Sequence, residues 1–253
     1  MMGRLTVSRR ALSAALLCAV ALGAGAPAAA GGVTDKLRDS LFKGRGGDPT
    51  AAPLARYVSE QGRIFTLDRT QPVPMLKFED SPEVWVLLPS PAPRGDVIYK
   101  NDLGEPMLRA TRLGGFTLFT DTRPNGEAVS LAGAGAPLRL PPMSPQALAD
   151  RMLQASYRSG RAARHAITFQ AEASPASAAL MGDAAVMVTL ALYRLAEKAG
   201  GRPVGRFSLV LFEEGRKPAA TLTDNVLRIV VAPAQGLAGR PSSKRIMKAA
   251  SGK

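Results

Sequence analysis

Cysteine and histidine are almost absent from the 253-residue chain, which has one of each, Cys18 and His165. Beyond residue 30 there is no cysteine, which excludes disulfides, thiolate metal sites, iron–sulfur clusters and thioether-linked haem from that part of the chain. A serine nucleophile would have to use His165 as its base, and the sequence has no G-x-S-x-G elbow to hold such a serine. We therefore expect no metal, no cofactor and no catalytic residue.

Acidic and aromatic residues are also scarce. The chain has 33 Lys plus Arg against 20 Asp plus Glu, a formal net charge of +13, and 5% of its residues are aromatic. Its 46% of hydrophobic and 21% of charged residues are typical of a globular chain and not of a disordered one. The composition predicts a folded basic protein that attracts phosphate, lipid headgroups or anionic glycans.

Residues 1–30 have the pattern of a secretory signal. Arg4, Arg9 and Arg10 accompany an apolar run at residues 11–22, and small residues then supply a cleavage pattern that ends at Ala30. An apolar run of about a dozen residues is too short to span ~30 Å of hydrocarbon, so we expect cleavage and not a retained anchor. Cleavage removes the three arginines and lowers the net charge from +13 to +10. We predict a periplasmic or secreted protein, exported by the general secretory or the twin-arginine route.

The processed chain is expected to be α+β and to contain a single domain at residues 56–238. A short helix and a flexible linker are expected at 31–55, and a disordered basic tail at 239–253, where every charged residue is basic. Residues 56–137 carry short β-type runs separated by Gly, Asn, Asp and Pro at hairpin spacing, which predicts an antiparallel meander, either a roll or a half-barrel. The expected strands lie at residues 57–58, 64–67, 75–78, 84–88, 97–99, 107–112, 116–119 and 128–131.

At residues 138–238 the pattern becomes helical. Ser144 and Ser174, each followed by proline, are N-cap signals that predict two helices, the second of them ending near Ala199. The uncharged residues 184–192 predict the buried centre of a core helix, and they are too few to cross a bilayer, so we expect no transmembrane segment in the processed chain. Apolar runs at 166–171, 207–212 and 226–231 predict a small antiparallel sheet.

One basic cluster stands out within the expected domain: Arg151, Arg158, Arg161 and Arg164. Positions 151 and 158 are seven apart and so lie on one helical face. The cluster is either an anion-binding site for an envelope component, such as lipid headgroups or a glycan, or an ordinary solvated face. Nucleic acid is not expected as a partner of an exported protein, and the sequence leaves the oligomeric state open.

A carboxylate-dependent, glycan-processing hydrolase is the alternative function. Two carboxyl groups about 5–9 Å apart can cleave a glycan by acid–base chemistry. The same acids could instead serve as helix caps and turn residues. The two functions differ in whether any two of these side chains face each other in a concave pocket. The candidate carboxylates are Glu79, Asp80, Glu83, Asp96 and Asp102.

The stretch at residues 81–120 is distinctive: SPEVWVLLPSPAPRGDVIYKNDLGEPMLRATRLGGFTLFT. Together with the preceding LDRT and MLKFED segments and the alanine-rich helix near Asp183, it resembles an uncharacterised family of exported proteobacterial proteins, domain of unknown function 4908. The resemblance implies a bacterial envelope protein, and it brings no activity, substrate or catalytic residue. Our sequence-based prediction is therefore a non-catalytic binding or envelope-associated module with a basic surface.

Overall fold

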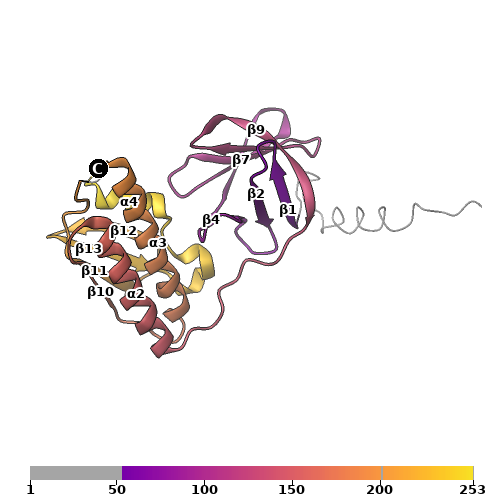
Figure 1. The fold of residues 1–253 in the computed structure, drawn as a ribbon. Helices are drawn as coiled ribbons and strands as arrows, with labels where there is room; N and C mark the ends of the chain where they lie inside the picture. Colours follow the sequence, from indigo (N-terminus) through magenta and orange to yellow (C-terminus); the bar gives the residue numbers. More distant parts are fainter. Residues whose placement is uncertain (1–52, 201, 253) are drawn as a thin grey trace, which may run out of the picture.

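The structure is a computed structural model that describes residues 53–200 and 202–252. The predicted signal segment, its cleavage position at Ala30 and the short helix expected within 31–55 lie outside the described residues. The described chain has an α+β fold with two lobes: a barrel-like sheet, then a layer of helices against a smaller sheet (Figure 1). This arrangement confirms the predicted fold class and the order of its two parts.

The first lobe is an antiparallel sheet whose strands follow the turn signals in the sequence. Its strands are β1 (Leu54–Ser59), β2 (Ile64–Asp68), β3 (Met75–Phe78), β4 (Val84–Val86), β5 (Leu88–Pro91), β6 (Val97–Lys100), β7 (Pro106–Ala110), β8 (Phe116–Thr120) and β9 (Arg123–Ala134). They lie in the order β4-β3-β2-β1-β9-β8-β7-β6-β5. Leu87 alone separates the two edge strands β4 and β5 along the chain, so the edges of the sheet meet there and the meander forms a nearly closed barrel (Figure 1).

Aromatic side chains fill the barrel. In β1 alternate residues point inward, and Tyr57 stacks on Phe65 with ring centroids 5.4 Å apart. Phe65 in turn contacts Phe78 edge-to-face at 5.9 Å. Burial raises the pKa of Tyr57 to about 12, so its hydroxyl stays neutral over the physiological range. The aromatic side chains of this cluster therefore stabilise the barrel core.

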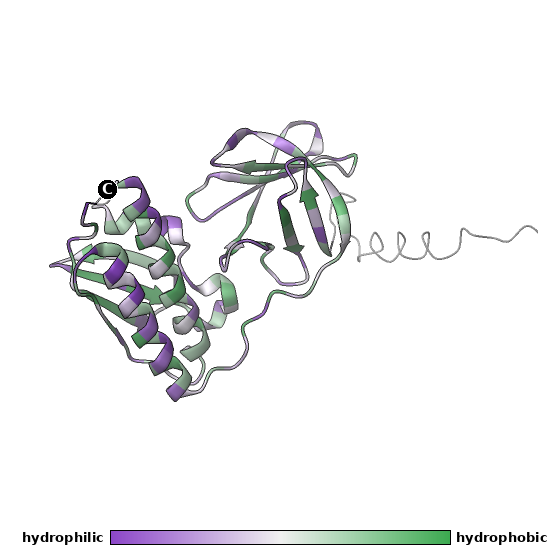
Figure 2. Ribbon diagram, viewed as in Figure 1, coloured by the Kyte–Doolittle hydropathy of each residue, from purple (hydrophilic) through white to green (hydrophobic). Residues whose placement is uncertain are grey.

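The second lobe has two layers. Its elements are α2 (Pro145–Ala163), β10 (Thr168–Ala171), α3 (Ala178–Lys198), β11 (Leu209–Glu214), β12 (Ala219–Thr223), β13 (Val226–Val231), the 3-10 turn η2 (Pro233–Gly239) and α4 (Ser243–Ala250). The helices cover one face of a sheet with strand order β10-β11-β13-β12 (Figure 1). Figure 2 shows that hydrophobic residues dominate these strands, whereas α2 alternates between hydrophilic and hydrophobic segments.

The prediction that this small sheet is antiparallel is wrong. Strands β10, β11 and β13 are parallel, and only β12 pairs antiparallel with β13. The reason lies in the connections, because α3 carries the chain from the end of β10 back to the start of β11, as a parallel crossover requires. The one antiparallel pair is closed by a two-residue turn at Asp224 and Asn225, whose φ values of 49° and 61° are those of a type I′ hairpin.

Helix α3 is the central helix of the second core, as residues 184–192 predicted. Met187, Val188 and Leu192 are fully buried there, whereas Leu190 is only half-buried. Among the described residues, α3 is the one helix that is long and apolar enough to cross a membrane by length and composition. Its apolar side chains pack against α2 and the sheet, in the hydrophobic cluster of this lobe.

The prediction of a disordered tail at 239–253 is wrong for its described part, because residues Ser243–Ala250 form α4. The Ser242 side chain caps this helix by accepting a hydrogen bond from the backbone N–H of Arg245 at 3.1 Å. Ile246 is fully buried and Ala250 is nearly so. Lys244 and Arg245 are paired with acids that lie far away in the sequence, which charge composition within a short window does not reveal.

Candidate functional site

Helix α2 carries the predicted arginine cluster and is strongly amphipathic. The Ser144 side chain accepts a hydrogen bond from the Ala147 N–H at 3.2 Å, and Pro145 begins the first turn, as the sequence predicted. Apolar and small residues at helical spacing, among them Leu148 and Met152, pack against the core. The opposite side of the helix therefore faces solvent.

We call the exposed residues Arg151, Arg158 and Arg161, with Arg164 at the C-cap, the arginine face. All four side chains are exposed, and none of them forms an ion pair or a side-chain hydrogen bond with any residue in the described part of the chain. The single acid on the helix, Asp150, accepts a hydrogen bond from Gln146 and not from an arginine. The positive charge of this face is therefore not neutralised by any acid within hydrogen-bonding reach.

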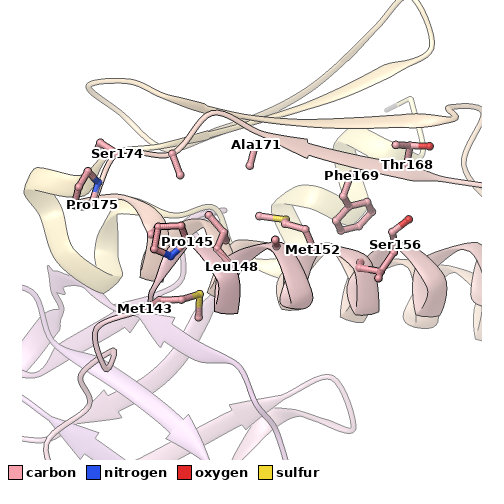
Figure 3. Close-up of a pocket in the computed structure, with 14 residues that line it drawn as sticks. Met143, Pro145, Leu148, Met152, Ser156, Thr168, Phe169, Ala171, Ser174 and Pro175 are labelled. Carbon is pink, nitrogen blue, oxygen red and sulfur yellow. The ribbon is translucent and has the colours of Figure 1, made fainter.

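Two large hydrophobic side chains lie beside these arginines. Leu153 is 72% exposed and Tyr157 is 67% exposed, and their i, i+4 spacing places them side by side on the helix. Leu153 also borders an apolar groove of about 600 Å³ between α2 and β10 (Figure 3). Exposed apolar residues next to unpaired cations are typical of a helix that lies at a membrane interface.

His165 follows the arginine face, and its ring forms hydrogen bonds with backbone carbonyl groups. Its Nε2 lies 2.9 Å from the Gly205 carbonyl oxygen and 3.2 Å from that of Val204, while Nδ1 lies 3.1 Å from the Ala166 oxygen. In this position the imidazole links the end of α2 to the loop before β11. Among the described residues, no serine or carboxylate forms a hydrogen bond with the ring.

The five carboxylates of the hydrolase alternative have separate partners. Four cavities of 220–680 Å³ lie among the described residues. Of the five carboxylates, only Asp102 lines one of these cavities. The pKa of Asp96 is lowered by the hydrogen bond from Arg109 and by the backbone N–H of Arg112. Three of the five form ordinary ion pairs: Glu79 with Arg56 at 2.7 Å, Asp80 with Arg63 at 3.1 Å, and Asp96 with Arg109 at 2.5 Å.

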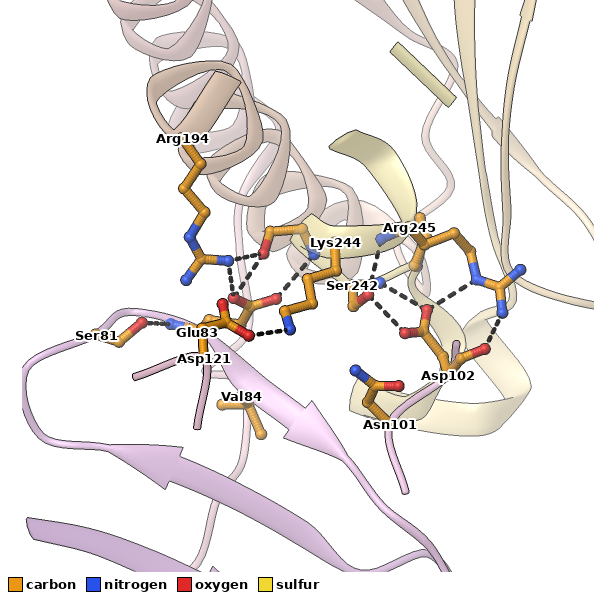
Figure 4. Close-up of polar contacts among 12 residues, drawn as sticks. Ser81, Glu83, Val84, Asn101, Asp102, Asp121, Arg194, Ser242, Lys244 and Arg245 are labelled. Atoms are coloured by element: carbon orange, nitrogen blue, oxygen red, sulfur yellow. Dashed lines mark hydrogen bonds and ion pairs between the residues drawn. The ribbon is translucent and has the colours of Figure 1, made fainter. Parts of the chain in front are cut away.

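The other two carboxylates attach α4 to the barrel (Figure 4). Glu83 is fully buried and accepts hydrogen bonds from the Ser243 N–H at 2.8 Å and the Ser243 hydroxyl at 2.7 Å. Arg194 of α3 donates a further bond to Glu83 at 3.0 Å. Asp102 accepts hydrogen bonds from the Ser242 N–H at 3.1 Å and from the Ser242 hydroxyl at 2.6 Å. It accepts a third from Arg245 Nε at 2.8 Å. These contacts join the two lobes and leave neither carboxylate free for acid–base chemistry.

Two carboxylates that the sequence analysis did not select meet in a cavity of about 400 Å³ at the same junction. Lys244 Nζ lies 2.9 Å from Glu105 and 2.7 Å from Asp121. The Lys244 hydrogen bond lowers the pKa of Asp121, so this carboxyl group stays ionised, whereas a general acid requires a raised pKa. Burial lowers the pKa of Lys244, but its bonds to Asp121 and Glu105 outweigh burial and raise it. No local sequence signal could have identified this triad, because Lys244 is more than a hundred positions from both acids.

Within residues 53–200 and 202–252, His, Cys, Asp and Glu side chains do not gather in any group of three that could hold a metal ion. The arginine face has no acid partner in the described chain, whereas the acids of the barrel are largely engaged in ion pairs.

The fold is that of a two-lobed α+β protein in which a nearly closed barrel is joined through α4 to a helix-covered sheet. The chain belongs to the family described as domain of unknown function (DUF4908), whose model matches residues 36–250. No curated protein and no solved structure matches the chain. Family membership confirms the resemblance found in the sequence and assigns no activity.

Proposed function

We propose that this protein is an exported, non-catalytic envelope module that binds anionic lipid headgroups through the arginine face of α2. The observation that carries this proposal is the set of four exposed arginines without an acid partner in the described chain. Leu153 and Tyr157 beside them supply apolar and amphipathic contacts at the depth of the headgroups. The proposal that the protein is exported is based on the secretory pattern of residues 1–30.

Lipid is favoured over a soluble glycan because the exposed Leu153 and Tyr157 need a partly apolar surface. Basic residues near an anionic membrane contribute about 1 kcal/mol each. Replacing Arg158, Arg161 and Arg164 by Gln should therefore weaken binding by roughly 3 kcal/mol, which is more than a hundredfold. The three positions are exposed, so the thermal melt should not change.

The test is co-sedimentation with vesicles of phosphatidylglycerol mixed with phosphatidylcholine, at low and high salt. Wild-type binding should fall steeply as salt rises, because exposed charges are screened over ~8 Å at physiological ionic strength. A charge-matched control replaces Arg112, Arg123 and Arg139 by Gln, since these arginines are also exposed and lie outside α2. The control variant should retain most of the binding.

An equal loss of vesicle binding in the two triple variants would mean that binding depends only on net charge, and it would refute a site on α2. Wild-type protein that binds a soluble anionic polysaccharide but not the vesicles would refute lipid as the ligand. The basic residues near the C-terminus are a smaller confounder than the sequence suggested, because Arg240, Lys244 and Arg245 are ion-paired with acids.

The dispersed carboxylates also support a binding role. A glycosidase requires two carboxyl groups converging on one bond. Here the five candidates form contacts with five different sets of partners, and two of them anchor α4.

A further inference from the structure

Strand β10 is an edge strand with unpaired main-chain groups. It pairs only with β11, and the Thr168 N–H donates to the Ser208 carbonyl at 2.8 Å. Main-chain groups of successive strand residues point to opposite sides, so those of Thr168 and Gln170 face β11 and those of Phe169 and Ala171 face outward. Among the described residues, no hydrogen bond is made to the outward-facing N–H and C=O of Phe169 or Ala171.

An apolar groove runs along this same edge, between β10 and α2 (Figure 3). Its walls include Leu148, Met152 and Phe169, and its volume is about 600 Å³. Six residues of α2 border it, and the first and last of them, Pro145 and Ser156, are eleven positions apart, which corresponds to about 16 Å at 1.5 Å per residue. That length accommodates roughly five residues of an extended chain.

One end of the groove is closed, and two arginines follow that end along the chain. The Ser156 hydroxyl donates a hydrogen bond of 2.5 Å to the Ile167 carbonyl and so ties α2 to the start of β10. Arg161 and Arg164 follow Ser156 on α2 and immediately precede this junction, and both are exposed and unpaired in the described chain. Neither arginine lines the groove, so a ligand would approach their positive charge only where it extends past this end.

We propose that the groove binds an extended, acidic peptide segment of a partner protein, which adds to the free edge of β10. The partner's main chain forms hydrogen bonds with Phe169 and Ala171, which a lipid chain or a sugar ring cannot do along a strand edge. Its alternate apolar side chains enter the groove, because side chains of an added strand point to the helix side at every second position. Acidic residues of the partner lie near Arg161 and Arg164.

The probe is a fluorescent heptapeptide of alternating glutamate and valine, with blocked ends, measured by fluorescence anisotropy. Ala149 is exposed and lines the groove, whereas Ala147 is exposed on the same helix and does not line it. Ala149→Trp should fill the groove and weaken binding at least tenfold, while Ala147→Trp should bind like the wild type. A peptide N-methylated at alternate residues should bind at least tenfold more weakly, because it lacks the amide donors of an added strand.

A second variant tests the strand edge itself. Ala171→Pro removes an outward-facing N–H that the sheet does not use, and proline is tolerated on edge strands. It should weaken peptide binding while thermal melts show that the fold is retained. The control peptide has lysine in place of each glutamate and should bind more weakly. The proposal is overturned if Ala149→Trp binds as well as Ala147→Trp, if N-methylation has no effect, or if this lysine–valine peptide binds as tightly as the glutamate–valine one. It is also overturned if sedimentation shows a wild-type dimer that Ala171→Pro dissociates, because a second copy would then occupy the edge.

Discussion

Glu83 provides the sharpest test of how the two lobes are joined. Its carboxylate is fully buried and accepts three hydrogen bonds, two from Ser243 and one from Arg194. Glu83→Ala would leave the Ser243 N–H without its acceptor and the guanidinium of Arg194 without its carboxylate partner. Removing one partner of a buried ion pair costs about 3–5 kcal/mol. The Arg194 side chain is 31% exposed and can be partly rehydrated, so we expect Glu83→Ala to lower the free energy of unfolding by about 3 kcal/mol.

The measurement is thermal and urea unfolding of Glu83→Ala beside Glu79→Ala. Glu79 pairs with Arg56 across an exposed surface, so its removal should cost no more than about 1 kcal/mol. At roughly 2–4 °C per kcal/mol for a chain of this size, Glu83→Ala should lower Tm by about 6–12 °C. Hydrogen exchange should accelerate first in α4. If Glu83→Ala destabilises the protein no more than Glu79→Ala does, the inter-lobe network does not contribute as described.

Three further predictions concern the core, the acid response and processing. Leu192→Ala should lower the free energy of unfolding by about 2–5 kcal/mol, because Leu192 is fully buried. A loss of less than about 1 kcal/mol, measured by urea unfolding, would contradict the placement of α3. The pKa values of Asp96 and Asp121 are lowered in the folded state, so their contribution to stability is present above the ordinary aspartate pKa and is lost as pH falls through the folded values. The Asp96→Asn, Asp121→Asn double variant should therefore have a lower Tm at neutral pH, and its Tm should fall less than that of the wild type as the pH is lowered. An unchanged dependence of Tm on pH would contradict these ion pairs. Intact mass of the exported protein should correspond to a chain that begins at Gly31, whereas a retained N-terminus or a lipid adduct on Cys18 would refute the predicted processing.

Local sequence signals predicted the elements of the fold better than their assembly. Each predicted barrel strand has a counterpart among β1–β9, because hairpin turns and apolar alternation act over a few residues. Closure of the barrel depends on β4 and β5, which lie next to each other in the chain and at opposite edges of the sheet, and no local pattern encodes that relation. The short strand β12, Ala219–Thr223, was not predicted, and its insertion beside β13 completes the mixed sheet.

The C-terminal helix shows why the remaining errors arose. A run of basic residues without acids is typical of a disordered tail when only the sequence window is considered. In the fold, Arg245 meets Asp102 at 2.8 Å and Lys244 meets Asp121 at 2.7 Å, and both acids lie more than a hundred residues upstream. By contrast, the exposure of the arginines on α2 was predictable from helical spacing, because the apolar stripe of that helix determines which side faces solvent.

The most direct test of lipid binding by α2 uses a fluorophore at the proposed contact. The processed chain would contain no cysteine, so Tyr157→Cys can be labelled at a single site with an environment-sensitive dye. Leu113→Cys is the matched control, because Leu113 is 93% exposed on the barrel. With anionic vesicles, the dye at position 157 should shift to shorter wavelength and high salt should reverse the shift, while the dye at 113 should not respond. Equal shifts at both positions, or a shift only at 113, would contradict the proposal that the arginine face of α2 contacts the membrane.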